Sequence, residues 1–207
     1  METFPVGCFQ CNCTVLACDR TREAVVIDPG DDEDRILKII EEKGLIVKHL
    51  VHTHAHLDHI GVAGPLKRKG HGSIFLHKGD EFLYDSLEDQ ARMFGLNLPE
   101  KDVVDENLEH KDEIEFGDHV LKVIHSPGHT PGSCCFLLEK KNILFSGDTL
   151  FQSSIGRTDL PGGDFDQIKD SILKRIYTLE KDYNVVPGHG PNTTLSYESK
   201  NNPFVRL

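Results

Sequence analysis

One arrangement occurs four times along this chain: an apolar stretch with strand character is followed directly by a short loop that carries histidine or aspartate. The apolar stretches are residues 45–51, 119–124, 142–146 and 183–186, and the loops that follow them are 52–61, 125–133, 147–149 and 187–191. Short apolar runs that alternate with helical patterns predict a sheet covered by helices. Loops at the ends of strands are the usual location of catalytic groups in such layered chains. We therefore expect these loops to form one functional site.

The first of these loops reads VHTHAHLDHIG and contains a third of the histidines in the chain. Its ionisable side chains are His52, His54, His56, Asp58 and His59. Clustered imidazoles repel one another when they become protonated. A metal ion removes this repulsion, because it holds each imidazole neutral and uses its lone pair. The order His-x-His-x-Asp-His thus favours a metal site over a merely polar loop.

The other three loops each add one candidate ligand. His129 lies between two Pro-Gly pairs that hold the loop HSPGHTPGS in a tight shape, Asp148 lies in Gly-Asp-Thr, and His189 lies in Pro-Gly-His-Gly-Pro. The candidate ligands are His54, His56, Asp58, His59, His129, Asp148 and His189. This number exceeds the needs of one tetrahedral zinc ion and suits two divalent ions that each keep an open position.

The spacing within the first loop divides these ligands between the two ions. His54 and His56 are two residues apart, so in extended backbone they point the same way and can bind one ion. Asp58 and His59 point elsewhere and can hold the second, while the two oxygens of Asp148 suit it to bridge both. Asp28 ends an apolar stretch before Pro-Gly. It is a candidate to support the loop 52–61, called the metal loop below, through a hydrogen bond to one of its ligands.

Outside the four loops and the strands before them, the hydrophobic pattern predicts further helices and strands of an α/β fold. We expect paired strands over 14–18 and 23–28, an amphipathic helix over 31–43, a helix near 60–69 and a strand over 73–77. A helix over 164–179 is expected to have a capping box formed by Asp164 and Gln167. Its predicted core stripe consists of Phe165, Ile168, Ile172, Leu173 and Ile176. Residues 79–118 are acidic and irregular with a helix near 80–93, and we interpret them as a surface insertion and candidate substrate lid.

Composition limits the classes of partner. The chain has 207 residues, enough for a single domain with a buried core, and its net charge is −11. This charge disfavours binding to nucleic acid or to an anionic membrane. No apolar run could span a bilayer and the N-terminal residues METFPVG show no secretion signal, so we expect a cytoplasmic protein. Its six cysteines, including the run Cys8-x-x-Cys11-x-Cys13, are expected to be reduced structural thiols.

The motifs THAHLDH, PGHTPG, SGDTLF and VPGHG, in this order, resemble the metallo-β-lactamase superfamily. The resemblance implies a four-layer αββα sandwich with metals at one edge of the paired sheets, formed by residues 1–207 as one domain. It implies that His54, His56 and His129 hold the first ion. It also implies that Asp58, His59 and His189 hold the second and that Asp148 bridges. The family has no ligand at the position of His52, for which a structural role at the strand end is expected.

Within the superfamily, the segments FPVGCFQCNC and GDTLFQSSIGRTDLPGGD resemble the hydroxyacylglutathione hydrolases, or glyoxalase II. The ending PGHGPNTTLSYESKNNPF is similar to their short bacterial relatives. The long enzymes carry a C-terminal helical domain that binds glutathione, and we expect this chain to lack it. Arg157 and Asp159 stand where the long enzymes have lysine and tyrosine. Arg157 can pair bidentately with a substrate carboxylate, or it can anchor its loop through a salt bridge.

The resemblance implies hydrolysis of a small-molecule thioester of the S-acylglutathione type, such as S-lactoylglutathione. Two divalent ions, expected to be zinc, with iron or manganese as alternatives, would activate the attacking water, and Asp58 would orient it. A monomer or small homo-oligomer is expected. One alternative is a persulfide dioxygenase of the same superfamily, with one iron held by His54, His129 and Asp148. Another is a non-enzymatic metal-binding or sensor protein, which the open ligand positions disfavour.

Overall fold

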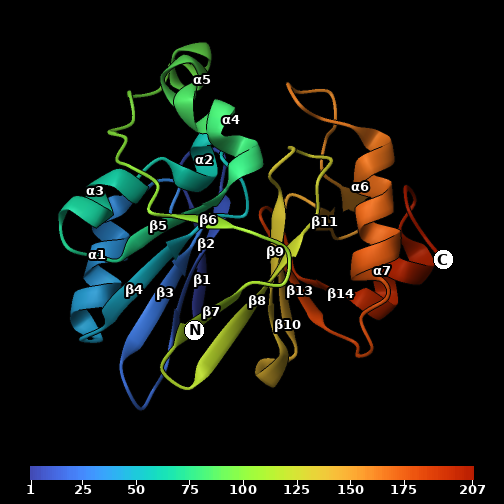
Figure 1. Ribbon diagram of the computed structural model, residues 1–207, viewed down its shortest axis with the longest axis horizontal. Coiled ribbons are helices and arrows are strands. Elements are labelled where there is room, and N and C mark those ends of the chain that lie inside the picture. The colour runs from blue at the N-terminus through green and yellow to red at the C-terminus, as the bar shows by residue number, and fades with distance from the viewer.

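Two six-stranded β-sheets pack face to face, and each has helices on its outer face (Figure 1). The computed structural model describes residues 1–207. The strand order is β1-β2-β3-β4-β5-β6 in the first sheet and β14-β13-β10-β9-β8-β7 in the second. This is the four-layer αββα arrangement that the sequence predicts.

The first sheet is antiparallel from β1 to β3 and parallel from β3 to β6. Its strands are β1 (Glu2–Val6), β2 (Cys11–Ala17), β3 (Glu23–Ile27), β4 (Ile46–Val51), β5 (Ser73–His77) and β6 (Glu106–Leu108). Two helices cover its outer face, α1 (Glu33–Glu42) and α3 (Ala63–Arg68). The short helices α2 (Leu57–Ile60), η1 (Lys78–Asp80), α4 (Glu81–Asp85) and α5 (Leu87–Phe94) gather at one end of the sandwich.

The second sheet is antiparallel except for the parallel pair β10 and β13. Its strands are β7 (Glu113–Phe116), β8 (His119–His125), β9 (Cys134–Leu138), β10 (Ile143–Gly147), β13 (Asn184–Pro187) and β14 (Thr193–Thr194). The hairpin of β11 (Leu150–Phe151) and β12 (Ser154–Ile155) extends from β10. Helix α6 (Phe165–Ser171), its π-helical continuation η3 (Ile172–Ile176) and α7 (Leu195–Asn201) cover the outer face. No helix combines the length and apolarity needed to cross a bilayer.

Three apolar cores separate the four layers. One lies between the first sheet and its helices and one between the second sheet and its helices, while the third fills the space between the sheets. In β3, Val26 belongs to the helix-side core and Val25 to the inter-sheet core, because successive side chains of a strand point to opposite faces. A strand buried on both faces therefore reads as a continuous apolar run.

The interpretation of residues 79–118 as an irregular surface insertion is wrong in its second half. Residues 106–108 and 113–116 form β6 and β7, the edge strands of the first and second sheet. The segment is thus the connection between the two sheets. In β7, Ile114 and Phe116 are buried between exposed glutamates, which is a half-buried strand pattern too short to stand out in an acidic stretch.

The helix predicted over 164–179 exists, but its details differ. Asp164 caps it by accepting a hydrogen bond from the backbone N–H of Gln167 at 3.0 Å. The side chain of Gln167 donates to the carboxylate of Asp164 and does not accept from its backbone N–H, which donates to the carbonyl of Gly128, so the capping box is incomplete. Phe165, the first residue of the helix, is 46% exposed, so the buried stripe begins one turn later, at Ile168.

Candidate metal centre

The four histidine- and aspartate-bearing loops meet at one edge of the sandwich. Strands β8, β10 and β13 run in the same direction, because β10 is parallel to β13 and both β8 and β10 are antiparallel to β9. Their carboxyl ends therefore lie at the same edge. The loop after β4 of the facing sheet reaches this edge as well, where His56 contacts His129.

Three imidazoles from two loops form the first cluster. Nδ1 of His56 lies 3.0 Å from Nε2 of His54 and 3.0 Å from Nε2 of His129. His54 and His129 are buried, and the three ligand atoms lie within 4.8 Å of one another. Imidazole nitrogens this close together, with their lone pairs directed at a common point, can hold one transition-metal ion.

The second cluster combines two imidazoles with a carboxylate. Nε2 of His59 lies 3.2 Å from Nε2 of His189. Oδ2 of Asp58 lies 3.2 Å from the same nitrogen of His189 and 3.7 Å from that of His59. These three side chains come from the loops after β4 and β13 and can hold a second ion.

Asp148 lies between the two clusters. Its Oδ2 is 3.6 Å from Nε2 of His129 in the first cluster and 3.7 Å from Nε2 of His189 in the second. Its Oδ1 is buried without a hydrogen-bond partner. Oδ1 lies 3.5 Å from Nε2 of His59, and a buried carboxylate oxygen without a hydrogen bond is costly, so this atom marks a place for a cation. A donor set of imidazole and carboxylate suits zinc, iron and manganese.

In three of the candidate ligands, the imidazole nitrogen that faces away from the cluster donates a hydrogen bond to an oxygen of the protein. Nδ1 of His54 donates to Oγ1 of Thr53 at 3.1 Å, Nδ1 of His129 donates to the carbonyl of Arg157 at 2.8 Å, and Nδ1 of His189 donates to the carbonyl of Phe9 at 3.1 Å. A proton held at Nδ1 leaves the lone pair of Nε2 directed into the centre.

Asp28 has the supporting place that the sequence suggests for it. Its Oδ2 accepts hydrogen bonds from Nδ1 of His59 at 3.0 Å and from Oγ1 of Thr53 at 2.7 Å, and its Oδ1 accepts from the backbone N–H of Thr53 at 2.7 Å. The turn after Asp28 passes beneath the metal loop. A Cβ on Gly30 would lie 1.6 Å from the carbonyl oxygen of Asp58, so only glycine allows this approach.

We expect Asp28→Asn to weaken metal binding roughly 10- to 100-fold, the usual loss when a hydrogen-bond partner of a ligand is changed. Asparagine preserves the shape of the side chain, but it removes the charge that fixes the tautomer of His59. Competition with a chelator measures the affinity. The exposed Asp19→Asn serves as the control, and an unchanged affinity in Asp28→Asn would contradict the assigned role.

Asp80 is a buried residue of the site that sequence reasoning missed. It accepts hydrogen bonds from the backbone N–H of Ala55 at 3.1 Å, from Oγ1 of Thr130 at 2.8 Å and from the backbone N–H of Gly132 at 2.6 Å. It thereby joins the loop after β4 to the loop after β8. Burial raises the pKa of Asp80, although these hydrogen bonds oppose the shift. The sequence feature that could have indicated this role is the position of Asp80 shortly after the predicted strand 73–77.

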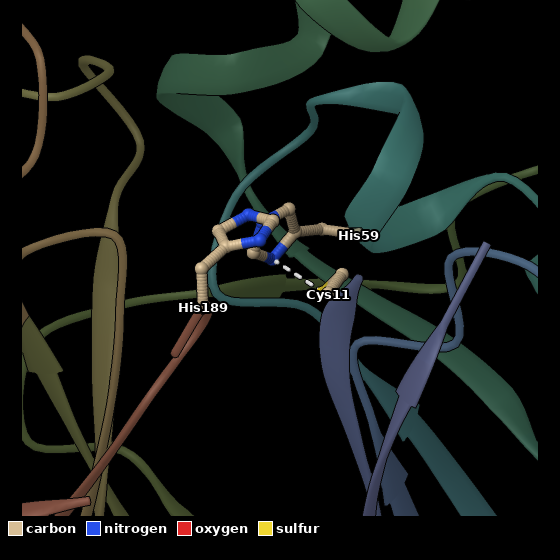
Figure 2. Close-up of side chains that lie close together, drawn as sticks. All are labelled: Cys11, His59 and His189. Carbon is tan, nitrogen blue, oxygen red and sulfur yellow. Dashed lines mark hydrogen bonds between the residues drawn. The ribbon is translucent and has the colours of Figure 1, made fainter. Parts of the chain in front are cut away.

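Cys11 contacts the back of a candidate ligand. Its Sγ lies 3.5 Å from Nδ1 of His59, whereas Nε2 of His59 lies close to His189 (Figure 2). Burial raises the pKa of Cys11 to about 12, so the sulfur is a thiol at neutral pH. All six cysteines are free, and Cys8 alone is exposed. Cys11 is thus a packing neighbour of His59 on the side away from Asp148.

The electrostatics of the site differ between the two clusters. Burial lowers the pKa of His54 well below its usual range and that of His56 to about 3, so both are neutral with free lone pairs. Burial also opposes charge on His59, but the carboxylates of Asp148, Asp58 and Asp28 outweigh it and raise its pKa. A cation must displace this proton, so metal affinity falls as the pH is lowered.

Two other predicted residues lie outside both clusters. The guanidinium of Arg157 is exposed and forms two hydrogen bonds of 2.7 Å with the carboxylate of Asp159. His52 is buried at the end of β4, with its Nδ1 3.0 Å from the carbonyl oxygen of Phe75 on β5.

Comparison with known protein families identifies the family to which the chain belongs. The pattern of the Metallo-beta-lactamase superfamily matches residues 6–189. The chain belongs to this superfamily. Hydroxyacylglutathione hydrolase GloC of Haemophilus influenzae is 39% identical over 207 residues, which cover 99% of this chain and 97% of that protein.

Solved structures of the superfamily superpose closely on this chain. The di-iron-bound form of TTHA1623 has a TM-score of 0.90 and 37% identity, and it covers 99% of this chain and 100% of its own. BLEG-1 B3 metallo-beta-lactamase has a TM-score of 0.91 and 35% identity, with 99% and 98% covered. ETHE1 from Myxococcus xanthus has a TM-score of 0.80 and 27% identity, with 98% and 84% covered. These similarities establish a metallo-hydrolase scaffold for the chain.

Proposed function

We propose that this protein is a metal-dependent thioesterase that hydrolyses S-acylglutathione-type substrates such as S-lactoylglutathione. The observation that carries the proposal is the position of Asp148 between the two ligand clusters, with one buried oxygen that accepts no hydrogen bond. Two divalent ions held by these clusters would lower the pKa of a shared water and polarise the substrate carbonyl. The similarity to a protein named hydroxyacylglutathione hydrolase supports the substrate class.

Asp58 is suited to orient the attacking water. Burial opposes its ionisation, but His59 and His189 outweigh this effect and lower the pKa of its carboxyl. Asp58 is therefore a hydrogen-bond acceptor at neutral pH. A thiolate leaving group has a free pKa of about 8.5, so cleavage of a thioester needs no strong general acid from the protein.

Arg157 is the cation proposed to bind a carboxylate of the thiol portion. Its carbonyl oxygen accepts the hydrogen bond from His129, which places its backbone beside the first cluster. Its guanidinium pairs with Asp159 on the surface, where such pairs contribute little stability. A substrate carboxylate can therefore compete with Asp159 for the same planar set of donors.

Dioxygenation of a persulfide is the second candidate, because the fold also matches ETHE1. The two candidates differ in the ligands that they require. Hydrolysis by two metal ions requires the ligands of both clusters. Dioxygenation by a single iron requires only His54, His129 and Asp148. Metal analysis, hydrolysis of S-lactoylglutathione and oxygen uptake on glutathione persulfide, measured on the wild-type protein, distinguish them. One iron with oxygen uptake and no thioester hydrolysis would falsify the thioesterase proposal.

We expect His189→Ala to lower thioester hydrolysis on the order of 10²-fold or more, because it removes one ligand of the second cluster and with it part of the charge stabilisation. The variant should also lose roughly half of its bound metal. His110→Ala, an exposed histidine outside the site, provides the control. Full oxygen uptake on a persulfide with His189 removed would instead support the dioxygenase.

A further inference from the structure

A groove of about 450 Å³ opens beside Asp58. Seven of its 17 lining residues are hydrophobic, including Val6, Phe9, Leu57, Val62, Leu96 and Leu98, and the others include four carboxylates. This volume is in the range of small-molecule sites in proteins. Asp58 belongs to both the groove and the second ligand cluster, and the carbonyl of Phe9, another lining residue, accepts a hydrogen bond from His189, so the groove adjoins the second cluster.

Two segments form the opposite walls of the groove. One is the turn Gly7–Phe9 between β1 and β2, and the other is the stretch 96–100 that follows α5. The rings of Phe9 and Phe94 meet edge to face at a centroid distance of 5.0 Å, which connects the turn to the end of α5. An aromatic contact therefore joins the two segments.

Gln90 on α5, the helix that precedes the stretch 96–100, forms hydrogen bonds with the loop that carries the candidate ligands. Its Oε1 accepts a hydrogen bond from the backbone N–H of Leu57 at 2.9 Å, and its Nε2 donates to the carbonyl of Ala55 at 3.3 Å. The wall and the ligand-bearing loop are thus held in a fixed relation. Part of the segment interpreted from sequence as a candidate substrate lid thus lines this groove.

The groove has no positively charged lining. Its ionisable residues besides Cys8 are Asp31, Glu33, Asp58 and Glu100. Glu33 pairs with Lys69 at 2.8 Å and Glu100 with Arg68 at 2.5 Å, but neither cation lines the groove. A carboxylate buried here would lose its hydration and gain no partner, which is costly. An uncharged apolar group has no such penalty.

Exposed apolar side chains border the groove as well. Phe9, Phe94 and Leu98 are 38%, 54% and 52% exposed. A contiguous group of large exposed apolar side chains marks a binding surface more often than a solitary one does. Their position beside the reacting centre indicates an apolar part of the substrate.

We propose that this groove is the acyl-binding site and that it selects thioesters with an uncharged, apolar acyl chain. The thiol portion then extends in the other direction, toward Arg157 beside the first cluster. This inference rests on the proposed thioesterase function. The lactoyl group is short and carries a hydroxyl, so it leaves most of the apolar lining uncovered, whereas a hexanoyl chain covers it. An acidic acyl group such as succinyl meets only the acidic side chains.

A kinetic comparison at constant thiol tests the selection. We expect kcat/KM to be at least tenfold higher for S-hexanoylglutathione than for S-lactoylglutathione, and at least tenfold lower for S-succinylglutathione than for S-hexanoylglutathione. Phe9→Ala should reduce the hexanoyl-to-lactoyl ratio at least threefold. The matched control is Phe165→Ala, because this phenylalanine is 46% exposed on α6, outside the groove, and should keep the wild-type ratio.

Cys8 provides a readout that needs no turnover. It lines the groove and is the only exposed cysteine, so alkylation by iodoacetamide reports on this site. We expect S-hexylglutathione, a thioether that cannot be hydrolysed, to slow the alkylation of wild-type protein at least fivefold. S-methylglutathione at the same concentration should slow it less than twofold.

The outcomes separate this inference from the proposed function. Turnover of S-lactoylglutathione that matches or exceeds turnover of S-hexanoylglutathione, with equal protection of Cys8 by both thioethers, overturns the acyl groove and leaves the thioesterase intact. Protection by S-hexylglutathione without hydrolysis of any thioester supports the groove and overturns the thioesterase. Hydrolysis of the succinyl and hexanoyl thioesters at equal rates also overturns the selection.

Discussion

Asp148→Asn is expected to lower thioester hydrolysis on the order of 10³-fold, a loss typical of removing one charge-stabilising group from an active site. Oδ1 of Asp148 is buried without a partner, and its Oδ2 lies 3.6 Å from His129 and 3.7 Å from His189. The amide of asparagine has one oxygen and no charge, so it cannot bridge two cations. Metal analysis of the purified variant should therefore show reduced occupancy together with the loss of rate.

Asp166→Asn is the appropriate comparison for this substitution. Asp166 is exposed on the first turn of α6 and belongs to neither ligand cluster, so its change should leave both rate and metal content unaltered. Equal rates in Asp148→Asn and in the wild-type protein would remove the proposed bridge, whatever the metal content.

Gly188→Ala is expected to prevent metal binding while the chain remains folded. A Cβ at this position would lie 2.2 Å from Oδ1 of Asp148 and 2.7 Å from Cε1 of His59. The added methyl group therefore occupies space between ligands of the two clusters. Because the two closest contacts of the added methyl group are with ligand side chains, circular dichroism should show unchanged secondary structure while metal content and hydrolysis are lost.

Gly190→Ala separates obstruction from backbone strain. Gly190 lies two residues further along the same loop with a φ of +75°, and a Cβ there would meet nothing within 4 Å. Its substitution costs roughly 1–2 kcal/mol for the left-handed conformation and places no atom among the ligands. Full metal occupancy in Gly188→Ala, or an equal loss in Gly190→Ala, would show that the crowding at position 188 is not the cause.

The strands and the ligand types could be predicted from the sequence because both depend on local patterns. The spacing of His54 and His56 places both imidazoles on one side of an extended backbone, and the apolar runs before each loop identify buried strands. The hydrogen bond from His59 to Asp28 could be suggested only because Asp28 ends a strand immediately before a Pro-Gly turn.

Other features depend on pairings between distant residues, which local patterns do not encode. Strands β6 and β7 are too short to be identified without the sheets that they extend. Asp80 joins loops 25 and 50 residues away, to Ala55 and Thr130. Cys11 contacts His59 across 48 residues of sequence, so its expected structural role gave no indication of its proximity to the metal site.

The sequence by itself determined the types of donor that this protein can offer, because the identity and spacing of its histidines and aspartates predict a two-metal ligand set before any fold is known. The tertiary structure alone decided that Asp80 joins two loops through hydrogen bonds and that a groove without cations opens beside Asp58. The physical reason is that donor type is a property of each side chain. Distance, burial and the absence of a neutralising partner are properties of the packed chain.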